Sequence, residues 1–174
     1  MPSSSVPRRN PRGAFSALVF AAAAIAVLAV TAVWFWIQAP DVVPSHFDVT
    51  GRPDEWSSKS EILGILVPIG IGIPVLFSIR WIWESLPTSI VNIPNKDHWL
   101  ELGEDTYLYD CLMQFMRTLG GAIALLFTAI LVIMFKVGQG AESSVIVTLV
   151  PVAGFLVVSA AALWILVRQL DPRR

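Results

Sequence analysis

Four apolar runs constrain the fold of this chain more than any other feature. They occupy about 14–38, 62–83, 118–135 and 145–167. An α-helix rises about 1.5 Å per residue, so about 20 apolar residues are enough to cross the hydrocarbon core of a bilayer. Lipid cannot hydrogen-bond the backbone, and the runs are therefore predicted to be helices. The sequence predicts an all-α integral membrane protein with four transmembrane helices in one domain, 14–167.

Composition supports a bilayer environment. Of 174 residues, 55% are hydrophobic and 14% are charged, and a soluble core of this length cannot bury so much apolar surface. The net charge of -1 argues against a nucleic-acid partner. The only cysteine is Cys111, which excludes an internal disulfide. The first run follows a basic lead-in but is longer than a signal peptide and ends in aromatic residues, which predicts a retained anchor.

The distribution of Lys and Arg predicts the orientation. With the N-terminus inside, the inner segments hold Arg8, Arg9, Arg12, Arg80, Lys96, Arg117, Arg168, Arg173 and Arg174, and the outer segments hold Arg52, Lys59 and Lys136. This positive-inside bias predicts cytoplasmic termini in a multi-pass membrane protein. The expected segments are a disordered tail 1–13, an outer loop 39–61, an inner loop 84–117, a short outer turn 136–144 and a tail 168–174.

The outer loop combines turn formers with polar and aromatic side chains. Gly51 to Asp54 is a turn signal, and Ser60 followed by Glu61 resembles a helix start. We expect Gly51 and Pro53 to fold the loop back on itself, so that Asp54 hydrogen-bonds His46 or Lys59. The loop is either a recognition site or a compact cap with Phe47 and Trp56 at the headgroup level.

Neither a metal site nor catalysis is predicted for this loop. His46, Asp48, Asp54 and Glu55 do not have the spacing of a zinc or calcium site. No positioned nucleophile accompanies them, so an acid–base pair has nothing to activate. We therefore expect no cofactor and no enzymatic activity.

The inner loop is expected to be ordered. Pro87 and Pro94 stop the second helix, residues 95–97 are turn-like, and a helix from Asp105 to Arg117 should run into the third span. That helix is amphipathic, with Leu108, Leu112, Phe115 and Met116 on one side. Pro94 and Trp99 are predicted to pack against the inner ends of the spans. The acidic residues of the loop suit a protein partner, although a solvated connector is the alternative.

Small residues and prolines mark helix contacts within the membrane. Pro68, Gly70, Gly72 and Pro74 should kink the second span or allow close packing. Gly120, Ala124 and Thr128 form a small-residue stripe in the third span, against a helix of this chain or of another. The spans lack internal charge apart from Arg80 near an end, which argues against a pump or coupled transporter.

Two strings resemble a bacterial membrane protein family catalogued as domain of unknown function 1648. The first, PSHFDVTGRPDEWSSK, carries the family elements Pro44, His46, Phe47, Gly51, Pro53, Asp54, Trp56, Ser58 and Lys59. The second, VNIPNKDHWL, carries Asn92, Pro94, Asn95, Lys96, Asp97 and Trp99, with His98 where tyrosine is expected. The resemblance covers about 14–136 and is fairly specific in its first motif.

The resemblance implies a multi-pass protein of a bacterial cell (inner) membrane, and it supports topology more than function. The family is similar in its first part to the immunity protein against a secreted sporulation-delay toxin, which has six spans where this chain has four. The candidate ligand- or partner-binding residues are Pro44, His46, Phe47, Gly51, Pro53, Asp54, Trp56, Lys59, Asn92, Pro94, Lys96, Asp97 and Trp99. We expect a non-enzymatic binding, immunity-like or signalling accessory with a protein partner in the membrane; the alternative is a structural or accessory subunit of a larger complex.

Overall fold

The computed structural model describes residues 11, 13–87 and 89–173. Four of its helices are long and apolar enough to cross a membrane: α1 (Ala14–Gln38), α2 (Lys59–Ser78), α5 (Asp105–Gly138) and α6 (Val145–Gln169). Two short helices, α3 (Arg80–Ser85) and α4 (Lys96–Glu101), lie between α2 and α5. The predicted disordered tail falls on residues 1–10 and 12, outside the described part of the chain, and on Pro11 and Gly13, which lead into α1.

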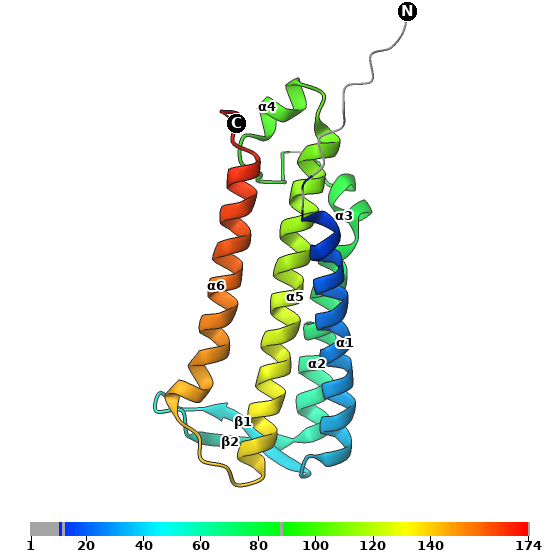
Figure 1. The fold of residues 1–174 in the computed structure, drawn as a ribbon. Helices are drawn as coiled ribbons and strands as arrows, with labels where there is room; N and C mark the ends of the chain where they lie inside the picture. Colours follow the sequence, from blue (N-terminus) through cyan, green and yellow to red (C-terminus); the bar gives the residue numbers. More distant parts are fainter. Residues whose placement is uncertain (1–10, 12, 88, 174) are drawn as a thin grey trace, which may run out of the picture.

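Helix α5 is the centre of the bundle. It packs against α1, α2 and α6 and also contacts α3, α4 and the first strand. Its 34 residues span about 51 Å at 1.5 Å per residue, which exceeds a hydrocarbon core of about 30 Å. The predicted helix from Asp105 is therefore the first part of α5 itself. The start of α1 and the end of α6 lie at one end of the bundle, and the strands lie at the other (Figure 1).

The expectation of an all-α fold is wrong at the outer loop, which is a β-hairpin. Strand β1 (Val42–Phe47) pairs antiparallel with β2 (Pro53–Ser58). The hairpin, residues 42–58, lies across one end of the bundle (Figure 1). Val43 and Pro44 are fully buried there and pack near Gly138 at the end of α5. The sequence did not indicate these strands, because only the adjacent residues Val43 and Pro44 are buried in them and no alternation of buried and exposed residues results.

The contact between α2 and α5 confirms the predicted close packing. Gly120 of α5 faces Pro74 of α2, and a Cβ at residue 120 would lie 3.1 Å from the Cα of Pro74. Gly70 and Pro74 are both buried. The small-residue stripe of the third span therefore meets a helix of its own chain. Helix α2 continues through both Pro68 and Pro74, so these prolines do not divide it into two half-helices.

Several predicted boundaries shift. Ser58, not Ser60, caps α2, since its hydroxyl accepts a hydrogen bond of 3.3 Å from the backbone N–H of Glu61. The second apolar run breaks at Ile79, so Arg80 lies at the start of α3 and binds Glu84 and Asp110. Helix α6 continues to Gln169, which places Arg168 inside the helix and not in a tail.

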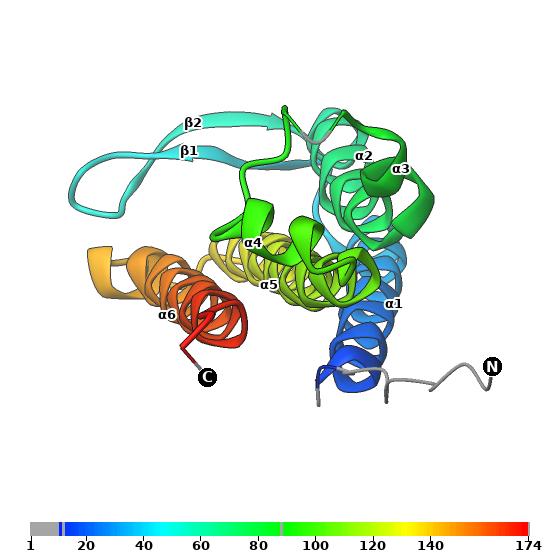
Figure 2. The ribbon, with the colours of Figure 1, turned by 90° about the horizontal axis from the view of Figure 1, so that it is seen from above.

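Helix α6 stands apart from the rest of the bundle. Its packing is almost entirely on α5, and the view along the bundle shows it on the side of α5 away from α1 and α2 (Figure 2). Only Ala162 and Leu166 of its residues are buried. Exposed apolar residues such as Ile146 and Val157 suit a lipid-facing helix.

Candidate functional site

The two motifs lie at opposite ends of the bundle. The hairpin holds the first motif, and a segment that leads into and includes α4, residues 91–101, holds the second. We call residues 91–101 the capping segment, because side chains from it reach the C-terminal end of α6. The structure thus does not bring the thirteen candidate residues into one site. It forms two sites that are separated by the length of the helices (Figure 1).

Two bulges shape the hairpin. The pairs are Val42–Ser58, Val43–Ser57, Pro44–Trp56, His46–Glu55 and Phe47–Pro53, which leaves Ser45 and Asp54 without opposite partners. A bulge bends a strand and redirects a side chain. The bulge at Asp54 lets its carboxylate reach the ring of His46, although Glu55 is the residue directly opposite.

Asp48 organises the turn that joins the strands. Its Oδ1 accepts hydrogen bonds from the backbone N–H of Thr50 (2.8 Å), the hydroxyl of Thr50 (2.7 Å) and the backbone N–H of Arg52 (2.9 Å). Thr50 and Arg52 thereby stabilise the carboxylate and lower the pKa of Asp48 below its ordinary value. The turn spans residues 48–52, so Pro53, which was predicted to lie within the turn, instead begins β2.

Gly51 joins the hairpin tip to the start of α6. Its φ is +79°, a left-handed conformation that suits glycine. A Cβ at this position would lie 2.7 Å from the carbonyl oxygen of Ser144 and would overlap the backbone between Ser144 and Val145. Two independent features therefore require glycine at this position: its left-handed backbone conformation and the close approach of the backbone of Ser144 and Val145. Its predicted role in folding the loop back is confirmed, and the contact with α6 is additional.

His46 and Asp54 form the polar pair of the hairpin. The Nδ1 of His46 donates to Oδ1 of Asp54 at 2.6 Å, with side chains 61% and 46% exposed. The hydrogen bond from Asp54 and its negative charge raise the pKa of His46 above 6.5. Of the two partners predicted for Asp54, the structure selects His46.

We expect the Asp54→Asn substitution to lower the pKa of His46 toward 6.5, because the amide removes the charge that favours the imidazolium. A raised pKa in the folded state means that the pair stabilises the hairpin below pH 6.5 and that this contribution is lost as the pH rises through the raised pKa. NMR titration of the His46 imidazole signals in wild-type and variant protein measures the shift. An unchanged His46 titration in the variant would contradict the pairing.

Lys59 belongs to a different cluster from His46 and Asp54, contrary to the predicted alternative. Its Nζ lies 3.1 Å from Asp41, donates to the carbonyl oxygen of Ala39 at 3.2 Å, and is 5.6 Å from the ring centroid of Trp36. Its side chain is 20% exposed. Lys59 therefore joins the end of α1 to the start of α2 and supports a carbonyl near a helix C-terminus.

The remaining residues of the first motif divide between packing and exposure. Pro44 is fully buried, and Phe47 is partly buried against the core formed by α1, α2 and α5. Trp56 is 49% exposed. Glu55 is also exposed, and the structure shows no ion pair to it among the described residues. The exposed polar and aromatic groups of the hairpin thus include His46, Asp54, Glu55 and Trp56, with Thr50 and Arg52 exposed at its tip.

The capping segment confirms the prediction that Trp99 packs against the end of a span. Trp99 is 3% exposed, and its Nε1 donates to the carbonyl oxygen of Leu170 at 3.1 Å. Asn95, with a left-handed φ of 54°, donates from Nδ2 to the same oxygen at 3.1 Å. The hydroxyl of Tyr107 donates to the carbonyl oxygen of Gln169 at 3.1 Å. These three donors satisfy carbonyls that the end of α6 leaves without helical partners.

Other residues of the second motif have distinct positions. Asn92 and Pro94 line a mostly apolar cavity of about 470 Å³ together with residues of α3, α5 and α6. Lys96 donates to the carbonyl oxygen of Val91 at 3.2 Å, which closes the segment on itself. Asp97 is exposed in the first turn of α4.

Sequence reasoning missed three contributors. Asp48 was not selected for the site, although an aspartate two to four residues before the donors of a glycine-containing turn is a signal for its role. Asp41 and Tyr107 gave no local signal, because their partners Lys59 and Gln169 are distant in the chain. In the described part of the chain no three His, Cys, Asp or Glu residues group as a metal site would require.

Comparison with known proteins finds one family to which the hairpin region is similar. The model of the family described as "Domain of unknown function (DUF1648)" matches residues 22–73. The match includes most of α1, the hairpin and most of α2, and it stops before the capping segment. Comparisons with curated proteins and with solved structures gave no match. Residues 22–73 of this chain are therefore similar to the family of domains of unknown function DUF1648.

Proposed function

We propose that the protein is a non-enzymatic, multi-pass membrane protein that binds a protein or peptide partner through its hairpin. The observation that carries this proposal is that different residues of the hairpin anchor it to the bundle and remain exposed on its surface. Val43 and Pro44 are buried, and Gly51 contacts α6, so these residues account for how the hairpin is held. His46 and Trp56 remain open on the surface, beyond what anchoring requires.

The open surface suits a positively charged partner. Asp54 and Glu55 are exposed carboxylates in β2, the strand that also carries the exposed Trp56. A cationic side chain gains from both carboxylate contact and the face of an aromatic ring. An immunity-like role, with a secreted peptide as the partner, is one form of this proposal.

The proposal places the hairpin outside a bacterial cell membrane and the capping segment in the cytoplasm, as the distribution of Lys and Arg favours. A Ser57→Cys variant should then react with a membrane-impermeant thiol reagent in whole cells. The native Cys111 should not react, and wild-type protein is the control for it. Labelling of Cys111 without labelling of residue 57 would reverse the orientation.

Partner binding can be tested with a photo-crosslinking amino acid in place of Val49, which is 93% exposed near the hairpin tip. We expect a crosslinked product in intact cells that falls about tenfold when His46→Gln and Asp54→Asn are combined, since a charged hydrogen bond contributes about 1.5 kcal/mol. Glu61→Gln is the matched control, because it removes an exposed carboxylate just outside the hairpin. Undiminished crosslinking in the double variant would refute the proposed site.

A second candidate function is that of a subunit of a larger membrane complex. The observation that favours it is a mostly apolar groove of about 390 Å³ between α1, α5 and α6, lined by small residues such as Ala129 and Gly154. Small residues allow another helix to approach closely. Purification in mild detergent distinguishes the two functions, because fixed stoichiometric subunits would favour this one.

A further inference from the structure

Both motifs contact the same helix, at opposite ends. The hairpin tip at Gly51 meets the backbone of Ser144 and Val145, where α6 begins. The side chains of Asn95 and Trp99 bind the carbonyl oxygen of Leu170, directly after α6 ends. The 25 residues of α6 separate these contacts by about 37 Å at 1.5 Å per residue. The hairpin and the capping segment, which are remote from each other, are therefore connected through one helix, α6.

Between its ends α6 has a single main neighbour, α5. It packs almost entirely on α5, and its buried residues Ala162 and Leu166 lie toward the end that meets the capping segment. In its first half, Ile146 is 70% exposed and Val150 is 62% exposed. The position of that half therefore depends strongly on the hairpin tip, since no buried side chain fixes it.

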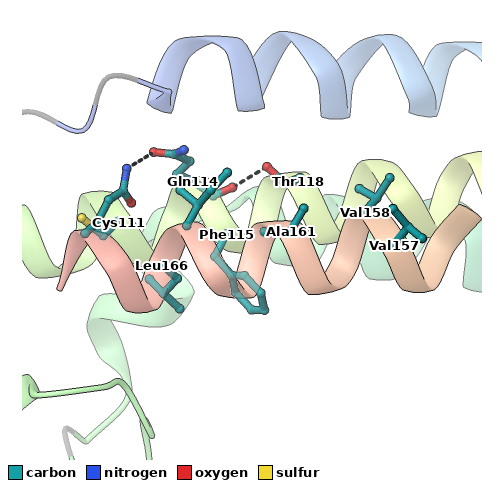
Figure 3. A pocket seen from close by; sticks show the side chains of 11 residues that line it. Cys111, Gln114, Phe115, Thr118, Val157, Val158, Ala161 and Leu166 are labelled. Carbon is teal, nitrogen blue, oxygen red and sulfur yellow. Dashed lines mark hydrogen bonds between the residues drawn. The ribbon is translucent and has the colours of Figure 1, made fainter. Parts of the chain in front are cut away.

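Open grooves flank the line of contact between α5 and α6. One has a volume of about 210 Å³ and is lined by Cys111, Gln114, Thr118 and residues of α6 (Figure 3). Near it, Gln169 donates to the side chain of Gln114 at 3.1 Å. The groove of about 390 Å³ lies on α5 and α6 farther along, next to α1. Space on the sides of α6 allows it to tilt without forcing atoms into a packed core.

We propose that α6 couples the hairpin to the capping segment across the membrane, so that a displacement of the hairpin tip tilts α6 and loosens the contacts at Leu170. A helix transmits motion as a rigid element when its two ends carry the specific contacts and its middle can slide. This inference goes beyond the proposed function, and it requires no partner to be known.

The single cysteine of the chain is a native reporter of this coupling. Cys111 is fully buried and lies in the α5–α6 groove near Leu166, at the far end of α6 from Gly51. A Gly51→Asn variant keeps a residue that tolerates a left-handed φ but adds a Cβ toward Ser144. We expect it to speed the labelling of Cys111 by a hydrophilic maleimide in mild detergent by roughly three- to tenfold, because local opening sets the reaction rate of a buried group.

Two controls separate coupling from other effects. Val49→Ala changes an exposed residue of the same turn and should leave the rate unchanged. Leu28→Ala removes a buried side chain from the core of α1, α2 and α5 and destabilises the bundle without altering either end of α6. Labelling is compared in urea-free detergent after circular dichroism and gel filtration show that each variant is folded.

The outcomes decide the proposal. Faster labelling in Gly51→Asn than in Leu28→Ala supports coupling, and reciprocity predicts that Asn95→Ala speeds exchange of the Gly51 amide hydrogen. The proposal is overturned if Cys111 in Gly51→Asn is labelled at the wild-type rate, or if Cys111 in Leu28→Ala is labelled as fast as in Gly51→Asn. If Gly51→Asn does not fold, the Asn95→Ala measurement decides alone, and unchanged exchange at Gly51 overturns coupling. None of these results depends on crosslinking at the hairpin, so failure of the partner proposal is recognised separately.

Discussion

Replacing Gly51 by alanine is expected to destabilise the protein by about 2–5 kcal/mol, the largest effect of any substitution in the hairpin. The left-handed φ of +79° costs an L-residue about 1–2 kcal/mol. The new Cβ would also overlap the backbone of Ser144 and Val145, and forced overpacking costs about 1–3 kcal/mol. Backbone atoms of a helix start cannot rotate away as a side chain can. Thermal unfolding in detergent measures the loss.

Gly140 offers a matched control for this substitution. Its φ is +89°, but a Cβ there would meet no atom within 4 Å. Gly140→Ala should therefore show only the conformational cost of about 1–2 kcal/mol. The difference between the two variants isolates the contact of the hairpin tip with α6. Equal destabilisation by both would show that the tip does not brace the helix.

Replacing Trp99 by alanine is expected to cost about 3–5 kcal/mol, as for other buried large-to-small changes. The indole is 3% exposed and packs 5.1 Å, between ring centroids, from Tyr107. Its removal leaves a cavity and takes one of two side-chain donors from the carbonyl oxygen of Leu170. The end of α6 should lose order together with the capping segment.

The Trp99→Phe substitution separates the effect of the lost side-chain volume from the effect of the lost hydrogen bond to Leu170. Phenylalanine keeps most of the apolar volume but lacks the indole N–H, so its expected cost is only about 1–2 kcal/mol. Limited proteolysis of the capping segment provides the local measurement, and cutting should accelerate much more in Trp99→Ala than in Trp99→Phe. Cutting of wild-type residues 92–100 as fast as of the N-terminal tail would show that the segment is a mobile tether.

Much of the fold could be predicted locally. The four spans follow from length and hydropathy, because a bilayer accepts a chain of this kind only as helices. The reversal of the loop at Gly51 follows from turn chemistry within a few residues. The ordering of the second motif follows from its prolines, its turn residues and its single tryptophan. Each of these features is decided by residues that are neighbours in the chain.

The strands were not predictable in the same way. Val42 to Phe47 and Pro53 to Ser58 each contain a proline, and half of their residues are polar, which resembles a loop. Their strand state depends on pairing with each other and on the burial of Val43 and Pro44 near the end of α5. Strand propensity is strongly dependent on such context.

The sequence by itself determined which segments cross the membrane and where the chain turns, because these properties depend on hydrophobicity and backbone preferences over short distances. Only the tertiary structure decided that Asp54 binds His46 while Lys59 binds Asp41, and that Gly51 and Trp99 meet the two ends of α6. The partners in the last two contacts are backbone groups of Ser144 and Leu170, 93 and 71 residues away along the chain. Every residue carries the same backbone groups, so the residue type at those positions contains no signal that identifies them.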